Sequence, residues 1–253
     1  MSIAVFGGNG FLGRKICEYG IRNGFKVTSF SRSGIPPLKS NQHLQQVKWE
    51  SADIFDDSTY KSQLSEFKTV FHSMGKIFED ESYKKDISSG GLNLNFVKKL
   101  IVGSNPMDKT IHNSYNGLNK ESALKLAFAY YKANKNGKLV YISADKGLPV
   151  IVPSDYIRSK REAETELLKS KLNSLIIRPG IMYDEDERNN RYILVNGMKQ
   201  LHQLKQQALG NDLSCVNNTI RPILSTDQVC SRIFQNLHED NTVITLEKLM
   251  KSY

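Results

Sequence analysis

Residues 2–13 read SIAVFGGNGFLG, and this stretch decides the fold of the chain. The apolar run 2–6 has the length of a buried strand. After the glycines, residues 14–22 have the spacing of a helix, and Gly24 can end that helix in a left-handed turn. Residues 25–30 form a second apolar run. The pattern predicts a strand, a tight glycine turn, a helix and a second strand.

Three glycines in this turn have the spacing of a dinucleotide-binding fingerprint. Gly7 lets the chain turn sharply out of the strand, Gly10 lets a pyrophosphate approach the backbone, and Gly13 lets the helix pack against the sheet. The helix N-terminus adds N–H groups and the positive end of the helix dipole. We predict a dinucleotide phosphate site here; the alternative is a glycine turn without a ligand. The predicted contact residues are Gly7, Gly8, Asn9, Gly10, Phe11, Leu12 and Gly13.

The end of the second apolar run indicates which dinucleotide is bound. NAD-preferring folds place an Asp or Glu there to bind the ribose 2′-hydroxyl, whereas this chain has Ser31 followed by Arg32. No carboxylate is present to repel a 2′-phosphate, and an arginine can bind a phosphate with two hydrogen bonds. We therefore predict NADP(H) as the cofactor, with NAD(H) less favoured. The alternative is that Arg32 is a solvated surface residue.

Two further candidate cofactor residues follow the third predicted strand, residues 47–50. The carboxylate of Asp53 can accept a hydrogen bond from an adenine amino group, and Ile54 can pack against the adenine ring. The alternative is that Asp53 caps the following helix, expected at 58–67, although Asp57 is better placed for that cap. We predict that Asp53 and Ile54 line the adenine end of the site.

The composition is that of an α/β chain with a substantial core. The chain has 253 residues, 39% of them hydrophobic, and we expect no segment that spans a membrane. Cys17, Cys215 and Cys230 are scattered, without the spacing of a metal site or a disulfide framework. We therefore predict no metal and a reducing compartment.

The net charge of +9 has three interpretations. It can attract nucleic acid or an anionic membrane, serve a phosphorylated ligand, or reflect a compartment such as the mitochondrial matrix. Nucleic-acid binding is the least favoured, because no basic run is interleaved with aromatic residues. The first strand begins at Ser2, so we expect no cleavable presequence, although Arg14, Lys15 and Arg22 would suit an internal targeting signal.

Strands and helices alternate along the chain, which predicts a doubly wound, mainly parallel α/β sheet of the Rossmann type. We expect an NADP(H)-binding domain at 1–180 and a small C-terminal region at 181–253 that covers the substrate side of the same domain. Residues 76–110 are expected to be a loop with some helix. The other predicted helices cover 111–135, 153–169, 192–209 and 227–237, and the other strands lie at 68–75 (with its loop), 138–144, 173–178 and 242–246.

A tyrosine and a lysine after the fifth strand carry the predicted chemistry. Tyr156 and Lys160 lie one helical turn apart, so their side chains share a face of the helix. A lysine ammonium near a phenol lowers the phenol's pKa, so the tyrosine can exchange a proton with a carbonyl or alcohol. Ser143, at the end of the preceding strand, is predicted to hold the substrate oxygen.

Two alternatives compete with this prediction. Tyr131 and Lys135 have the same spacing, but they precede the strand that ends in Ser143. The other alternative is that Tyr156 and Lys160 form an exposed helix face. The order of the elements favours Tyr156, because it begins a helix beside the nicotinamide end of the site.

These residues together resemble the short-chain dehydrogenase/reductase superfamily, in its extended or atypical branch, over nearly the whole chain. Residues 7–13 match the glycine fingerprint of that branch, and Ser143, Tyr156 and Lys160 match its catalytic triad. The resemblance implies an NAD(P)-binding fold and oxidoreductase activity. The residues that it adds to the cofactor site are Ser73, Gly75 and Pro179. The family's Asn-Ala-Gly after the fourth strand is Ser73-Met74-Gly75 here, which is a departure from the pattern.

A closer resemblance is to reductase-like proteins of the fungal mitochondrial coenzyme Q (ubiquinone) biosynthetic complex, and a more distant one to reductase-like accessory subunits of respiratory complex I. The segments that carry it are 5–13, 31–34, 141–147, 159–164 and 220–222. It implies a protein on the matrix side of the mitochondrial inner membrane, peripherally associated with that membrane. The implied partners are coenzyme Q biosynthetic proteins and a hydrophobic substrate or quinone intermediate.

Two functions stay open at this point, and a third, an RNA-binding reductase-like protein, is suggested only by the charge. The first is an NADP(H)-dependent oxidoreductase that acts on a quinone-ring intermediate, with Tyr156 as the acid/base. The second is a non-catalytic, NADPH-binding accessory or assembly subunit of the biosynthetic complex. Relatives that hold NADPH structurally exist, so the triad is compatible with both functions.

Overall fold

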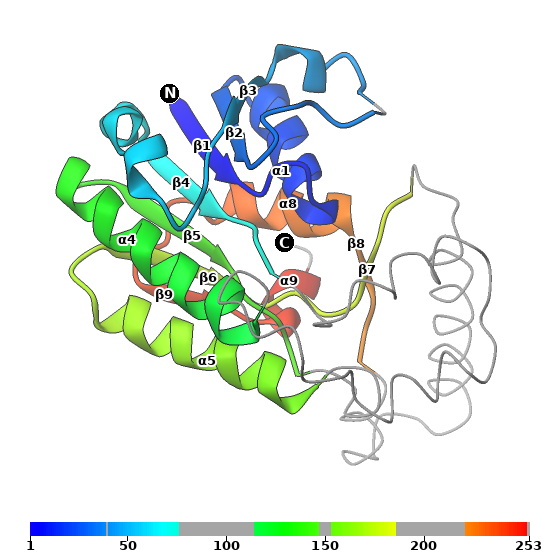
Figure 1. Ribbon diagram of the computed structural model, residues 1–253. Coiled ribbons are helices and arrows are strands. Elements are labelled where there is room, and N and C mark those ends of the chain that lie inside the picture. Colours follow the sequence, from blue (N-terminus) through cyan, green and yellow to red (C-terminus); the bar gives the residue numbers. More distant parts are fainter. Residues whose placement is uncertain (39, 76–113, 147–152, 186–220, 252–253) are drawn as a thin grey trace, which may run out of the picture.

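The computed structural model describes residues 1–38, 40–75, 114–146, 153–185 and 221–251, and the fold is reported for these residues. One sheet of parallel strands runs in the order β3-β2-β1-β4-β5-β6-β9, with helices on both faces (Figure 1). Its strands are β1 (Ser2–Phe6), β2 (Lys26–Ser31), β3 (Lys48–Ser51), β4 (Thr69–His72), β5 (Lys138–Ile142), β6 (Asn173–Ile177) and β9 (Thr242–Ile244). The helices are α1 (Phe11–Arg22), α4 (Ser122–Ala133), α5 (Ser154–Lys169), α8 (Thr226–Gln235) and α9 (Leu246–Met250). The doubly wound, mainly parallel α/β fold is therefore confirmed.

The direction of the strand order reverses between β1 and β4. Strand β1 pairs in parallel with β2 on one side and with β4 on the other. In open sheets of this kind, ligands bind outside the carboxyl ends of the strands at such a switch point. The turn after β1 and the loop after β4 therefore border the predicted dinucleotide site.

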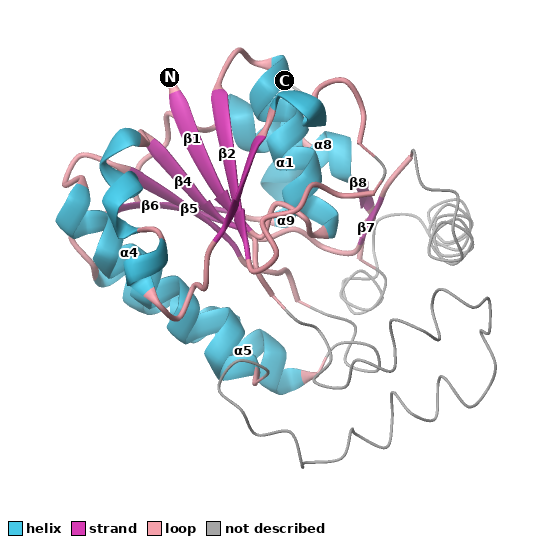
Figure 2. Cartoon of the chain, turned by 45° about the horizontal axis from the view of Figure 1, so that its top comes forward, coloured by secondary structure: helices cyan, strands magenta, loops and turns pink. Residues whose placement is uncertain are grey.

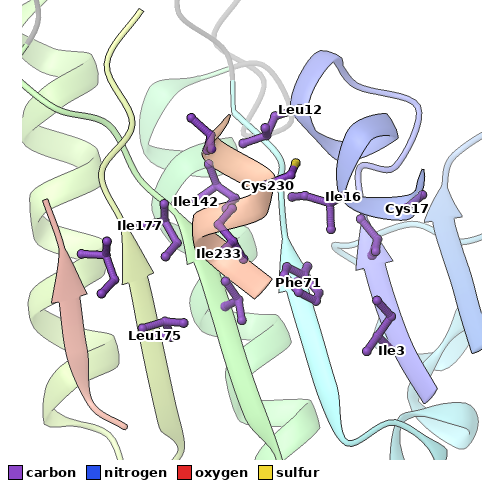
Figure 3. Close-up of a cluster of buried hydrophobic side chains, with 14 of the residues drawn as sticks. Ile3, Leu12, Ile16, Cys17, Phe71, Ile142, Leu175, Ile177, Cys230 and Ile233 are labelled. Carbon is purple, nitrogen blue, oxygen red and sulfur yellow. The ribbon is translucent and has the colours of Figure 1, made fainter. Parts of the chain in front are cut away.

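Alternating side chains of the central strands build two cores, one on each face of the sheet. Ile3 of β1 belongs to the core beneath α1 and α8, whereas its neighbour Ala4 belongs to the core beneath α4 and α5. Figure 2 shows these two pairs of helices on opposite sides of the sheet. In the first core, Ile16 of α1 and Ile233 of α8 lie over the strands (Figure 3).

One strand from the C-terminal part of the chain joins the same sheet. Strand β9 pairs with β6 at the edge of the sheet. Two short strands, β7 (Met182–Tyr183) and β8 (Leu224–Ser225), pair in parallel as a separate sheet, which the sequence did not predict. Helix α8 begins directly after β8 with a capping box, in which Ser225 and Gln228 bind each other's backbone N–H groups. The division of the chain at residue 180 stays a prediction.

The expected helix at 58–67 is wrong in type and in its cap. The chain forms two 3₁₀ segments, Asp57–Thr59 and Lys61–Glu66, and the capping side chain is Asp56, which accepts from Ser58 N at 3.1 Å. The break falls at Tyr60, whose side chain is buried and whose hydroxyl donates to Ile54 O at 3.0 Å. This bond to a carbonyl six residues earlier holds Tyr60 between the two 3₁₀ segments.

The expected helix at 111–135 is also modified. Its described part begins with a π-helical turn, Asn116–Glu121, and continues as α4, which ends at Ala133. Lys135 therefore lies outside the helix, so the alternative pair Tyr131 and Lys135 does not share a helix face. The loop at 76–110, the helix at 192–209 and Cys215 lie outside the described residues.

Candidate functional site

The glycine turn after β1 is shaped partly by the fold and partly for a ligand. Gly7 has a φ of +89°, which favours glycine. A Cβ on Gly13 would lie 2.1 Å from Gly7 O, and one on Gly8 would lie 2.1 Å from Ser29 Oγ. A Cβ on Gly10 would meet only Gly7 O, at 3.1 Å. Packing alone therefore requires three of these glycines, while the open side of Gly10 fits the close approach of a pyrophosphate.

Helix α1 presents its positive end to this turn. Gly10 is the N-cap residue and makes no side-chain capping bond, and the first turn contains no acidic residue. The side chain of Asn9 connects this turn to the loop after β2, because its Nδ2 donates to Ile35 O at 2.7 Å. A helix N-terminus without a capping carboxylate suits an anion such as a phosphate.

The end of β2 forms a preorganised turn with an exposed arginine. Ser31 Oγ accepts from Gly34 N at 3.1 Å, and Ser51 Oγ donates to Arg32 O at 2.9 Å. The backbone of Arg32 is thus held, while its guanidinium is exposed and has no partner among the described residues. A free guanidinium at this position suits the 2′-phosphate of NADP(H).

The two residues predicted at the adenine end differ in their exposure. Asp53 is half-buried, and its Oδ1 accepts from Phe55 N at 2.9 Å. Ile54 is buried in the core beneath α4, so its side chain is committed to packing within the protein. Of this pair, Asp53 presents more surface to a ligand.

Lys160 lies at the carboxyl ends of β4 and β5. Its side chain is only 1% exposed, and Nζ donates to Ile142 O at 2.8 Å and to Met74 O at 3.1 Å. Nζ also lies 4.7 Å from the ring centre of Tyr141. Burial lowers the pKa of Lys160 to about 7, although Glu164 acts in the opposite direction. The amine can therefore exist in both protonation states near neutral pH.

Tyr156 lies one turn before Lys160 on the buried face of α5. Its ring contacts that of Tyr115, with centroids 6.2 Å apart and an interplanar angle of 72°. The two residues share a buried face, so they do not form the exposed surface that the sequence left as an alternative. An amine and a phenol on one buried helix face are suited to proton exchange.

The hydroxyl of Ser143 faces α5, where it binds Glu164. Ser143 is buried; its Oγ donates to Glu164 Oε1 and accepts from Arg161 Nη1 at 3.2 Å. Its N–H donates to Ile177 O at 2.8 Å, which extends the pairing of β5 with β6. The structure therefore brings Tyr156 and Lys160 to one face, and joins Ser143 to Glu164.

Asn119, in the π-helical turn before α4, completes the surroundings of Lys160 and was missed in the sequence. It is fully buried; its backbone oxygen accepts from Tyr141 Oη at 2.5 Å, and its Nδ2 donates to Ser159 Oγ at 3.0 Å. A Cβ on Gly75 would lie 3.1 Å from Lys160 Nζ and 3.2 Å from Asn119 Oδ1. No local pattern marks Asn119, because its partners come from other segments.

His72, at the end of β4, was also missed. It is fully buried, and Nε2 lies 2.8 Å from Ser122 Oγ, whose own proton goes to Leu118 O at 2.7 Å. Nε2 must therefore carry the proton of the neutral ring. Burial and the nearby Lys160 lower the pKa of His72 to about 3, so the imidazole stays neutral.

The remaining predicted cofactor residues follow the carboxyl ends of β4 and β6. Ser73 N donates to Phe6 O at 2.9 Å, which continues the pairing of β4 with β1. Pro179 is buried after β6, and its carbonyl accepts from Asp145 N at 2.7 Å.

Within the described segments, no cluster of three or more His, Cys, Asp or Glu could hold a metal ion. In the same segments, no helix has both the length and the apolar character needed to span a membrane.

Comparisons with known sequences agree with this geometry. A family profile described as NAD(P)H-binding matches residues 7–207. MIOREX complex component 2 of Saccharomyces cerevisiae is 37% identical over 275 residues, covering 99% of each chain. An uncharacterized chloroplastic protein of Arabidopsis thaliana is 28% identical over 226 residues, covering 88% of this chain and 62% of that protein.

Solved structures share the fold at low sequence identity. The enzyme WbmF of Bordetella bronchiseptica, in complex with NAD+, superposes with a TM-score of 0.60 at 18% identity, covering 97% of this chain and 72% of that one. UDP-glucose 4-epimerase of Thermus thermophilus, in complex with NAD, gives 0.59 at 17% identity, covering 99% and 81%. The chain therefore belongs to the NAD(P)H-binding family, and it shares the Rossmann fold of these NAD-bound structures.

Proposed function

We propose that this chain is an NADP(H)-dependent oxidoreductase that acts on a carbonyl or alcohol of a hydrophobic, quinone-ring intermediate in mitochondrial ubiquinone biosynthesis. The observation that carries the proposal is the buried pair on α5. Lys160 is held at the strand ends with a pKa lowered to about 7 by burial, one turn from Tyr156. Buried groups of perturbed pKa beside a cofactor crevice are typical of catalytic sites.

The preference for NADP(H) over NAD(H) rests on the end of β2. The exposed guanidinium of Arg32 has no partner within the described residues, and the backbone beneath it is held by Ser51. A 2′-phosphate would supply the missing anion, whereas the 2′-hydroxyl of NAD(H) would not. We assign residues 1–180 to the cofactor and residues 181–253 to the substrate side.

In this proposal the bound nicotinamide supplies or accepts the hydride. Tyr156 gives its hydroxyl proton to the substrate oxygen during reduction and takes it back during oxidation. The Lys160 ammonium stabilises the phenolate left on Tyr156. Asn119 and Tyr141 hold the segment that faces Lys160, since the Tyr141 hydroxyl binds the Asn119 carbonyl. The protein thus contributes a positioned proton and excludes water from it.

We place the protein in mitochondria, on the matrix side of the inner membrane, as a peripheral partner of coenzyme Q biosynthetic proteins. The segments that resemble such proteins support this placement, and so does the named role of the yeast relative as a component of a multiprotein complex. The net charge of +9 suits a basic compartment and an anionic membrane surface.

A second candidate function is a non-catalytic subunit that holds NADPH within the biosynthetic complex. The observation that favours it is the state of Ser143, whose hydroxyl is bound to Glu164 and Arg161 and not presented to a substrate. A site with Tyr156 and Lys160 but without a hydroxyl donor could retain the cofactor without turning over.

Two substitutions distinguish these functions in cells that lack the native protein. Tyr156→Phe removes the proton donor, and Gly10→Leu blocks the phosphate turn; ubiquinone content and NADPH binding are measured for each. The oxidoreductase proposal expects both variants to lose ubiquinone, while Tyr156→Phe still binds NADPH. Normal ubiquinone with Tyr156→Phe but not with Gly10→Leu would establish the accessory function. Normal ubiquinone with both would contradict the whole proposal.

A further inference from the structure

Glu164 is a buried carboxylate that neither the fingerprint nor the triad includes. It lies on α5 and is 2% exposed. It accepts hydrogen bonds from Ser143 Oγ, from Arg161 Nη1 at 2.6 Å and from Arg178 Nε at 3.0 and 3.1 Å. Arg178 Nη2 also donates to it. Glu164 therefore joins the ends of β5 and β6 to α5.

These contacts use the one proton that the Ser143 hydroxyl could donate to a substrate oxygen. A serine has one hydroxyl proton, and Ser143 gives it to Glu164 while it accepts from Arg161. Arg161 also holds the neighbouring strand end, since its Nη2 donates to Ala144 O at 2.8 Å. To hold a substrate oxygen, Ser143 would have to break a bond to an ionised carboxylate.

Glu164 also faces the proposed acid/base pair. Tyr156, Lys160 and Glu164 follow one another at intervals of four residues on one buried face of α5. The other groups around Lys160 are His72 from β4, which is neutral, and Tyr141 from β5. Of these groups, Glu164 is the one whose negative charge favours the ammonium form of Lys160.

We propose that Glu164 is a positioning residue of the site, which binds the Ser143 hydroxyl away from the substrate and retains the proton on Lys160. Ser143 then acts through Glu164 and is not the holder of the substrate oxygen. The inference rests on the proposed oxidoreductase function for the role of Lys160, but the bond between Ser143 and Glu164 is independent of any cofactor. A test of this bond can therefore succeed or fail independently of the proposed oxidoreductase function.

The first test is a double-mutant cycle on the unfolding equilibrium of the chain without cofactor. Ser143→Ala should lower the folding equilibrium constant about tenfold in the native background. In the Glu164→Gln background the same change should cost about threefold or less, because the charge-assisted bond is already gone. An equal cost in both backgrounds, or no cost in either, would overturn the proposal. Should Glu164→Gln not fold, the absence of a cost for Ser143→Ala alone would overturn it.

The second test measures the pH at which Lys160 titrates, from the pH dependence of unfolding relative to Lys160→Met. Glu164→Gln should lower this midpoint by about half a pH unit or more, because the attraction for the ammonium is lost. Glu162→Gln is the matched control: it removes a charge from the exposed side of α5, where Glu162 pairs with Lys120 at 2.8 Å, and should leave the midpoint unchanged. Equal shifts in both variants, or none in Glu164→Gln, would contradict a positioning role.

The third test is NADPH-dependent turnover of a short-chain ubiquinone analogue. Ser143→Ala should retain the native rate within about threefold, whereas Tyr156→Phe should lose about a hundredfold or more. A hundredfold loss for Ser143→Ala with unchanged stability would restore Ser143 as the oxygen holder and overturn the inference. A native protein that binds no NADPH would refute the proposed function and leave the double-mutant cycle to decide on Ser143 and Glu164.

Discussion

Two lysines are buried on opposite faces of the sheet, and their surroundings differ. Lys15 on α1 is 2% exposed and lies 3.2 Å from Asp227, 3.6 Å from Asp184 and 3.7 Å from Glu18. Lys160 on α5 is equally buried but, within the described residues, has no ion pair and binds two backbone carbonyls. Figure 2 shows the two helices on opposite sides of the sheet.

This difference separates a structural charge from a functional one. The carboxylates around Lys15 compensate its buried charge and join α1 to α8 and to the end of β7. Lys160 is taken out of water without an ion pair among the described residues, and burial outweighs the attraction of Glu164, which costs stability and brings its pKa to about 7. A buried lysine without an ion pair is a candidate for function, so the α5 side carries the proposed chemistry.

The largest expected effect comes from Lys160→Met and depends on pH. The pKa of Lys160 falls from 10.5 to about 7 on folding, so the unfolded chain binds more protons between these values and the native stability rises with pH there. This contribution is fully present above pH 10.5, is lost as the pH falls to 7, and amounts to on the order of 5 kcal/mol. Lys160→Met should lack it, as chemical denaturation across this pH range can show. An identical pH dependence in both proteins would mean that Lys160 is compensated like Lys15.

The matched substitution on the other face should act in the opposite direction. Lys15→Met leaves Glu18, Asp184 and Asp227 without their shared cation, so the free energy of unfolding at pH 7 should fall by about 3 kcal/mol. Lys61→Met, at an exposed position, is the control and should change stability by less than about 0.5 kcal/mol. A stable Lys15→Met protein would remove the contrast between the two lysines.

Two substitutions in the glycine turn before α1 distinguish glycines needed for packing from glycines needed for cofactor binding. Gly13→Ala places a Cβ 2.1 Å from Gly7 O and should cost about 2 kcal/mol of stability. Gly10→Ala meets only Gly7 O, at 3.1 Å, so it should unfold nearly as the native chain does, yet bind NADPH at least about tenfold more weakly. Thermal unfolding and NADPH titration of both variants provide the measurement. Native NADPH affinity in Gly10→Ala would show that the turn does not hold the phosphates.

Cofactor selectivity should depend on one exposed guanidinium. Arg32→Ala should weaken NADPH binding by about tenfold to thirtyfold, and NADH binding by less than twofold or so, because only NADPH carries the 2′-phosphate. Arg158→Ala removes an exposed arginine of α5 and controls for the change in net charge. Equal losses for both nucleotides, measured by calorimetry, would refute the 2′-phosphate assignment.

The smallest expected effect belongs to the alternative tyrosine. Tyr131 lies near the end of α4, and Lys135 lies beyond that helix, so Tyr131→Phe should leave NADPH turnover unchanged and stability within about 0.5 kcal/mol. Loss of turnover in Tyr131→Phe, with retention in Tyr156→Phe, would transfer the chemistry to the other helix.

The sequence predicts the parts of this molecule whose signals are local. The glycine spacing of residues 7–13 and the short apolar runs predict the β1–α1–β2 unit, and the alternation of elements predicts the parallel sheet. The four-residue spacing of Tyr156 and Lys160 likewise places both on one face of α5. The β1–α1–β2 unit and the Tyr156–Lys160 pair each lie within about thirty residues, and the parallel sheet follows from repeating such short units along the chain.

The sequence does not predict features that depend on distant partners. The break at Tyr60 was also missed, although its hydroxyl binds the Ile54 carbonyl only six residues away. Asn119 and His72 enter the site through contacts with residues of other elements. Glu164 resembles an ordinary helix glutamate until β5 and β6 bring Ser143 and Arg178 to it.

The most direct test of the account is a titration of the purified chain with NADPH and with NADH, followed by nicotinamide fluorescence. Binding should be saturable and should favour NADPH; it should be lost in Gly10→Leu and should lose its selectivity in Arg32→Ala. Absence of binding for both nucleotides would contradict the account, and Lys160 would then be a buried charge without a cofactor to explain it.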